Sequence, residues 1–210
     1  MAVVTIARQF GAGGRTLGSR LAKELGYRFL DDVVIQELAR RIKVPHEAVQ
    51  DIENIAGGLF SRIVSAMLSR SYMERLTGED FGYIDEVIYR KMLQEVIHDL
   101  ARKDNVVLLG RGGQYVLEDE PNTVHFLLVA DRSYRVAFMR DNYKLSPARA
   151  EEAVTEGEKR RRQIYSLFRR SDYNDPLHYH MVLNTSRMGQ DQALAQMVGC
   201  VKGCAETTKA

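Results

Sequence analysis

The chain has 210 residues, of which 45% are hydrophobic and 28% are charged, and its net charge is +2. These values are typical of one globular domain with a core of its own, and they exclude a long disordered protein. The small net charge argues against general nucleic-acid binding. No apolar stretch approaches the ~18 residues that a membrane span needs, so we expect no membrane contact.

The cysteines and the first residues bear on the cellular compartment. Cys200 and Cys204 are the only cysteines, which is too few for a disulfide framework and favours a reducing compartment. The N-terminus enters a strand pattern directly, without the features of a signal peptide. We therefore expect a cytoplasmic protein, and the sequence leaves its oligomeric state open.

In chain order, the first predicted element is a strand at residues 2–7, where the run AVVTIA is apolar throughout. A glycine-rich turn follows, and then a helix over 16–26 whose leucines recur every four residues. A short strand at 27–32 precedes a helix at 33–42. Residues 46–76 have helical periodicity in two pieces.

The rest of the chain continues the alternation of strands and helices. The sequence predicts a long amphipathic helix over 83–103, strands at 105–110, 123–130 and 180–184, and helices over 131–143, 146–170 and 191–203. Every strand is apolar throughout, which is typical of a parallel sheet covered by helices on both faces. Ligands bind such sheets at the carboxyl ends of the strands, so the segments after the strands are the candidate site.

The segment RQFGAGGRT, residues 8–16, has the glycine spacing of a phosphate-binding loop. Such a loop points consecutive backbone N–H groups at one anion, and the dipole of the following helix favours negative charge there. A tight turn that needs glycine only for packing is the alternative. The residues that we expect to bind the phosphates of a nucleotide are Arg8, Gly11, Ala12, Gly13, Gly14, Arg15 and Thr16.

This loop departs from the common pattern GxxxxGK[ST]. Arg8 occupies the first glycine position, Gly14 the lysine position and Arg15 the next position, with Thr16 one step beyond. The lysine of such loops neutralises charge on the phosphoryl group that is transferred. We expect Arg15 to replace it, with Arg8 as a second candidate, and we expect a Gly14→Lys substitution to be tolerated or to raise activity.

Three stretches, VVTIARQFGAGGRTLGSRLAKELGYRFLDD, VVLLGRGG and MVLNTSRMG, together resemble the cytidylate kinase-like branch of the nucleoside monophosphate kinases. The resemblance covers nearly the whole chain and implies one α/β domain over 1–210 of the P-loop NTPase type, with a parallel five-stranded sheet flanked by helices. Within this domain it implies a helical acceptor-binding insert at 33–82 and a lid at 146–175. It also implies ATP and Mg²⁺ as cofactors and nucleotides as small-molecule partners.

The resemblance assigns roles to four further arginines. Arg90 and Arg111 fall on arginines that bind the acceptor nucleotide. Arg162 and Arg169 fall on two lid arginines, and we expect them to share with Arg15 a catalytic role in stabilising the transferred charge. Seven residues separate the two lid arginines, so both can face one anion. A solvated helix surface is the alternative for this basic run.

Two carboxylates follow the second predicted strand. Asp32 is expected to face the acceptor and, together with Thr16, to bind Mg²⁺ through water. Asp31 is expected to cap the helix that begins at Val33.

Several positions differ from those of true cytidylate kinases. Gly112 stands where those enzymes carry an aspartate that helps to read the base, Ser166 where the lid carries an aspartate, and Glu37 where they carry a phosphate-binding arginine. We therefore expect transfer of the γ-phosphoryl group of ATP to a cytidylate-like nucleoside monophosphate or to a similar small phosphate acceptor. Two alternatives stay open: a nucleotide-binding sensor without turnover, and a kinase of a non-nucleotide metabolite.

Overall fold

The computed structural model describes residues 3–31, 33–42, 86–103, 105–168 and 172–207. Most of the predicted insert at 33–82 therefore lies outside the described residues, as do Asp32 and Arg169. None of the described helices is both long enough and apolar enough to cross a membrane.

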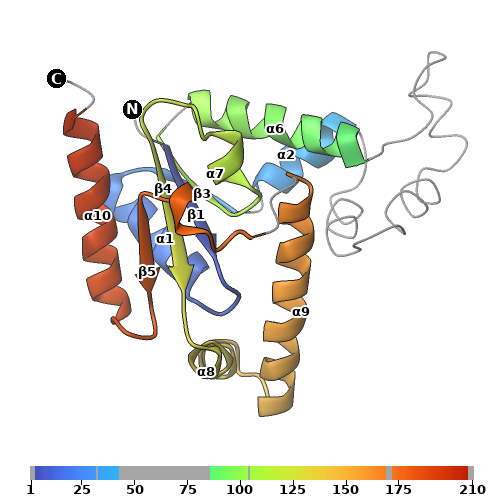
Figure 1. Ribbon diagram of the computed structural model, residues 1–210, viewed down its shortest axis with the longest axis vertical. Helices are drawn as coiled ribbons and strands as arrows, with labels where there is room; N and C mark the ends of the chain where they lie inside the picture. The colour runs from blue at the N-terminus through green and yellow to red at the C-terminus, as the bar shows by residue number, and fades with distance from the viewer. Residues whose placement is uncertain (1–2, 32, 43–85, 104, 169–171, 208–210) are drawn as a thin grey trace, which may run out of the picture.

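Five strands form one parallel sheet at the centre of the molecule (Figure 1). They are β1 (Val3–Arg8), β2 (Arg28–Leu30), β3 (Val106–Leu109), β4 (Thr123–Val129) and β5 (Met181–Asn184), in the order β2-β3-β1-β4-β5. All four strand pairs are parallel, and Val3 lies opposite both Val106 and Thr123. The prediction of a five-stranded parallel sheet is confirmed.

Central strand β1 is buried along its middle because Val4, Ile6 and Ala7 are all apolar and fully covered. The strands that flank it, β3 and β4, have the same apolar character. Since all three run in one direction, the segments that follow them meet at one edge of the sheet. This edge carries the glycine-rich loop.

Helices cover both faces of the sheet. On one face lie α1 (Gly14–Leu25) and α10 (Gln190–Thr207), whose apolar residues pack on β1 and β4 in one core cluster. On the other face, α2 (Val33–Ile42), α6 (Glu86–Lys103) and the short α7 (Gly113–Val116) form a second cluster with β2 and β3. The four-residue spacing of Leu17 and Leu21 puts both in the first core, as the sequence predicts.

Two helices lie beyond the carboxyl edge of the sheet. Helix α8 (Arg132–Tyr143) follows β4, and α9 (Pro147–Ser166) runs from α8 past the sheet toward α2 and α6 (Figure 1). The hydroxyl of Ser146 accepts from the N–H of Arg149 at 3.4 Å, and Pro147 takes the first helical position, so the start of α9 is well defined. The predicted lid thus begins as one continuous helix, and a 3₁₀ turn at Pro176–His178 follows the lid.

Candidate functional site

The glycine-rich loop lies between the end of β1 at Arg8 and the start of α1 at Gly14. Gly11 and Gly13 have φ values of +85° and +79°, which side chains rarely adopt. A Cβ on Gly11 would lie 2.7 Å from the carbonyl oxygen of Arg135. Ala12 is fully buried, and its carbonyl accepts from the hydroxyl of Thr185 at 3.1 Å. Glycine is therefore needed for the shape of this loop, which packs tightly on its surroundings.

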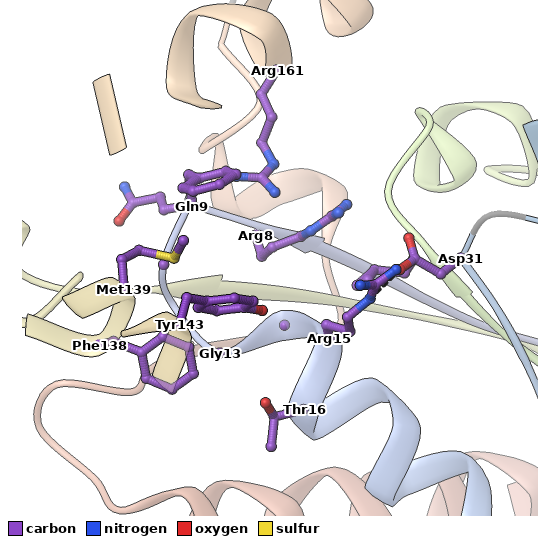
Figure 2. Close-up of a pocket in the computed structure, with 14 residues that line it drawn as sticks. Arg8, Gln9, Gly13, Arg15, Thr16, Asp31, Phe138, Met139, Tyr143 and Arg161 are labelled. Carbon is purple, nitrogen blue, oxygen red and sulfur yellow. Dashed lines mark hydrogen bonds and ion pairs between the residues drawn. The ribbon is translucent and has the colours of Figure 1, made fainter. Parts of the chain in front are cut away.

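A pocket of about 270 Å³ opens over this loop. The loop forms its floor, and α8 contributes an apolar wall of Phe138, Met139 and Tyr143. Charged side chains also line the pocket, and Figure 2 shows Arg8 between Arg161 and Arg15, with Arg15 beside Asp31. Three guanidinium groups and one carboxylate among the described lining residues make the pocket net positive.

The side chain of Arg8 fills the space beside the loop position that usually holds lysine. A Cβ on Gly14 would lie 2.7 Å from Cγ of Arg8 and 3.2 Å from its Cβ and Cδ. At the far end, a Cβ on Gly110 would meet Nη1 of Arg8. This geometry argues against the expectation that Gly14→Lys is tolerated, because the first carbons of Arg8 already occupy that space.

Arg15 lies at the exposed start of α1. Its Nε donates to Oδ2 of Asp31 at 2.6 Å, and the Arg15 side chain is 59% exposed whereas that of Asp31 is 15% exposed. Arg15 lines the pocket, but Asp31 balances its charge. Asp31, to which the sequence assigned a capping role, is itself a pocket residue.

The inward-facing arginine of α9 is Arg161. Its guanidinium lies 4.9 Å from the centre of the Phe10 ring, and its Nη1 is buried without a hydrogen-bond partner among the described residues. Burial lowers the pKa of Arg161 to about 9, and the positive charge of Arg8 adds to the effect. Burial likewise lowers the pKa of Arg8. Neither cation has enough neighbouring negative charge to offset its burial.

Arg162 is exposed, so the expectation that it faces the pocket is not met. The buried residues Ala150, Val154 and Gly157 recur at four- and three-residue steps along α9, and Tyr165 follows eight residues later, with Arg161 midway between Gly157 and Tyr165. This spacing places Arg161 on the docked face and turns Arg162 by about 100° toward solvent. The apolar stripe is therefore the sequence signal that could have identified Arg161.

Helix α9 is docked directly on the loop. One carboxylate oxygen of Glu158 accepts from the backbone N–H of Phe10 at 2.5 Å and from Nη1 of Arg135 at 3.0 Å. The other accepts from the hydroxyl of Tyr173 at 2.5 Å. A Cβ on Gly157 would overlap the Phe10 ring. These contacts, which the sequence did not suggest, hold Arg161 over the pocket.

One predicted acceptor residue, Arg111, lies in the next loop along the same sheet edge, GRGG at 110–113. Arg111 has a φ of +60°, an uncommon conformation for a residue with a side chain. Gly112 is covered by the Phe168 ring, since a Cβ there would lie 2.2 Å from Cε2 of that ring. From α6, Arg90 donates Nη1 to the carbonyl of Leu167 at 3.0 Å. The end of α9 therefore contacts both the loop at 110–113 and the predicted acceptor arginine of α6.

Glu37, a departure from true cytidylate kinases, pairs with its own helix. It accepts from Nη2 of Arg40 at 2.7 Å and from Nε of Arg41 at 3.1 Å. The hydrogen bond from Arg40, with the weaker effect of Arg41, lowers the pKa of Glu37 to about 2.

The sequence profile of the cytidylate kinase-like family matches residues 3–187, which is most of the chain. This chain belongs to the cytidylate kinase-like family. No curated protein matches the sequence significantly. The family assignment supports a phosphotransferase of the kinase type that uses a nucleotide.

Solved structures agree with the fold of this cytidylate kinase-like chain. An uncharacterized protein from Eubacterium ventriosum has 16% identity and a TM-score of 0.67, over 96% of this chain and 99% of that one. TT1252 from Thermus thermophilus has 17% identity and a TM-score of 0.50, over 96% and 97%. Shikimate kinase from Acinetobacter baumannii has 14% identity and a TM-score of 0.49, over 97% and 94%. At such identities the likeness is one of fold alone.

The sequence resemblance implies Mg²⁺ as a cofactor, and the pocket offers oxygen atoms that could bind it. Thr16 and Asp31 both line the pocket and offer oxygen ligands, whereas the described part of the chain has no group of three or more His, Cys, Asp or Glu side chains suited to a metal ion. Mg²⁺ commonly keeps several waters and takes its remaining ligands from one or two carboxylates and the substrate phosphates. The residues present fit an ion of that kind.

Proposed function

We propose that this chain transfers the γ-phosphoryl group of ATP to a nucleoside monophosphate, cytidylate-like, or to a similar small phosphate acceptor. The observation that carries the proposal is the net positive pocket over the loop, where Arg8, Arg15 and Arg161 converge beside the start of α1. Backbone N–H groups at a helix N-terminus and several guanidinium groups suit a polyphosphate better than any neutral ligand. The cysteine content favours a cytoplasmic location, where ATP is available to a kinase.

The proposed roles follow from position. Backbone N–H groups of residues 11–15 would hold the donor phosphates, and the arginines around the pocket would neutralise the charge that moves toward the acceptor. When bound, Mg²⁺ would supply further charge neutralisation at the phosphates, with Thr16 and Asp31, which line the pocket, as oxygen ligands through water. The carboxylate of Asp32 remains the ligand that the sequence suggests. No strong base is required, since positioning and charge neutralisation dominate phosphoryl transfer.

Arg90 and Arg111 are the proposed acceptor residues. Arg111 follows β3 at the same edge as the loop, and its unusual backbone angle is typical of residues held in place for function. The catalytic role proposed for Arg162 and Arg169 requires a rotation or displacement of the end of α9, because Arg162 is exposed in this conformation.

The proposal is tested by incubating the purified protein with ATP, Mg²⁺ and a panel of nucleoside monophosphates, and following ADP. We expect ADP formation that depends on one class of acceptor. ATP binding without ADP formation on any acceptor would favour a sensor protein instead. Small sugars and hydroxy acids belong on the same panel.

A second candidate, a kinase whose acceptor has no nucleobase, is favoured by one contact. Phe168 covers Gly112, at the position where an aspartate would help to read a base. The adjacent carbonyl of Leu167 accepts a hydrogen bond from Arg90, which is therefore already engaged. ADP formation with a sugar or acid but with none of the nucleotides would establish this candidate.

A further inference from the structure

The path of the Arg8 side chain depends on two glycines that are far apart in sequence. It leaves the end of β1 and passes Gly14, where an added Cβ would meet three of its carbons within 3.2 Å. It ends beside Gly110, where an added Cβ would overlap its Nη1. Among the described residues, the three nearest atoms to that Cβ at Gly14 are all from Arg8, so residues 8 and 14 compete for one space.

Arg8 is one of the residues that line the pocket, and Figure 2 shows its side chain between those of Arg161 and Arg15. Asp31 lies near enough to attract it, but Asp31 also pairs with Arg15 at 2.6 Å. Arg161 approaches from α9 with its buried, unpartnered Nη1, and the two guanidinium groups repel one another. Two like charges buried close together, one of them with an unpartnered nitrogen, are costly unless an anion joins them.

We infer that Arg8 supplies, from the first position of the loop, the cation that such loops usually carry at the position of Gly14, and that Arg8 and Arg161 together bind one phosphoryl group of the donor. The inference rests on the proposed function and deepens it, because it replaces the expected partner Arg15 by Arg8. The loop thus carries the same positive charge as the common pattern, but on a residue at a different position. A glycine at 14 is then the consequence of an arginine at 8.

Exchange of the two residues is the sharpest test. Arg8→Gly together with Gly14→Lys produces the pattern GxxxxGK and removes every atom that the new side chain would meet first. We would measure the affinity for inorganic pyrophosphate by calorimetry, which needs no acceptor and no turnover. Arg8→Gly alone should weaken binding about 10-fold, as expected for a lost charge-assisted hydrogen bond. Gly14→Lys alone should weaken it as well, because it displaces Arg8.

The double variant should bind pyrophosphate within about threefold of the natural chain, far better than additivity of the two losses would allow. Arg161→Met should weaken binding about 10-fold, and Lys159→Met, at an exposed position on the same helix, should not. A double variant that binds no better than either single variant would overturn the exchange. Equal binding by Arg161→Met and Lys159→Met would overturn the role of Arg161.

Two outcomes keep this inference separate from the proposed function. Pyrophosphate binding that follows the pattern above, with no ADP formed on any acceptor, would support the arginine pair and contradict the kinase. A natural chain that binds neither pyrophosphate nor ATP would contradict the pair itself. If thermal unfolding shows that the double variant does not fold, Arg8→Met serves instead: it keeps an unbranched side chain beside Gly14 and removes the charge, and unchanged pyrophosphate affinity would then overturn the role of Arg8.

Discussion

Two loops at the same edge of the sheet have similar backbones and different surroundings. The loop at 8–16 follows β1 and the loop at 110–113 follows β3, and each ends in a glycine N-cap, Gly13 with a φ of +79° and Gly112 with a φ of +71°. Over the first loop lies a pocket with three arginines, whereas Phe168 covers the second. A glycine turn before a helix is thus only a possible anion site, and side chains from other elements decide whether an anion has access.

The length of the helix behind each loop also differs. Helix α1 has 12 residues and α7 has 4, so only the first loop precedes a helix whose dipole can favour an anion appreciably. The difference in function that we propose between the loops therefore has three physical causes: the helix dipole and the cations at the first loop, and the aromatic cover at the second.

The largest expected effect comes from adding a methyl group at matched glycines of the two loops. Gly11→Ala should lower ATP affinity about 100-fold, because it combines an unfavourable φ with a clash against the backbone of Arg135. Gly112→Ala has a similar φ and displaces Phe168, so it should cost about 1–3 kcal/mol of stability while ATP affinity changes less than about twofold. Calorimetry and chemical unfolding on both variants measure the difference. Equal losses of ATP affinity would mean that the loops do not differ in function.

Acidification should lower the stability of the fold that carries both loops, because a buried histidine lies in the sheet beneath them. Nδ1 of His125 on β4 forms a hydrogen bond with the hydroxyl of Thr5 at 2.7 Å. The methyl group of Thr5 lies close to Gly113, in the second loop. Burial, with the nearby His180, lowers the pKa of His125 to about 4 from 6.5. Between these two values the unfolded chain binds the proton and the folded chain does not, so stability falls as pH decreases through this window.

We expect this proton to cost about 2 kcal/mol of stability at about pH 5 relative to neutral pH. Urea unfolding of the natural chain and of His125→Gln at both pH values measures it, and the variant should lose about that much pH dependence. Identical pH dependence in the two chains would show that His125 is not the titrating group.

The smallest expected effect concerns the cover of the second loop. Phe168→Leu keeps an apolar side chain over Gly112 but loses the ring contact with Tyr115, whose centre lies 5.9 Å away. The loss should be about 1 kcal/mol of stability, with ATP affinity unchanged and the KM of the acceptor altered. Steady-state kinetics with the acceptor that the panel of nucleotides, sugars and acids identifies separates these parameters. A change in ATP affinity alone would contradict the assignment of this loop to the acceptor side.

The fold could be predicted because each strand is a short apolar run between turn signals. Strands β1, β3 and β4 are buried on both faces. Short runs that are apolar throughout are typical of the central strands of a parallel sheet, so their position can be predicted. The same reasoning placed α1, whose leucines repeat with the helical period and whose last turn ends at Gly26 with a φ of +70°.

The site could be predicted only in part. The loop at 8–16 was predicted because its signal is local, in the glycine spacing. The sequence points to Arg162 and not to Arg161, because neighbouring residues on a helix lie on different faces. Only the docking of α9 on Phe10 determines which face is buried. The cover of Gly112 by Phe168 joins residues 56 positions apart, and no local pattern indicates such a contact.

Hydrogen–deuterium exchange with and without ATP and Mg²⁺ tests the central difference between the two loops most directly. If the first loop binds the donor phosphates through its backbone, the segment 10–16 should exchange more slowly when ATP is present, because several of its N–H groups become hydrogen-bond donors to phosphate. The N–H groups of Phe10 and Ala12 already donate within the protein and should contribute less to this change. Those of residues 111–116 should exchange as before in the absence of an acceptor. Slower exchange at 111–116 without any change at 10–16, or no change at either loop, would contradict the account.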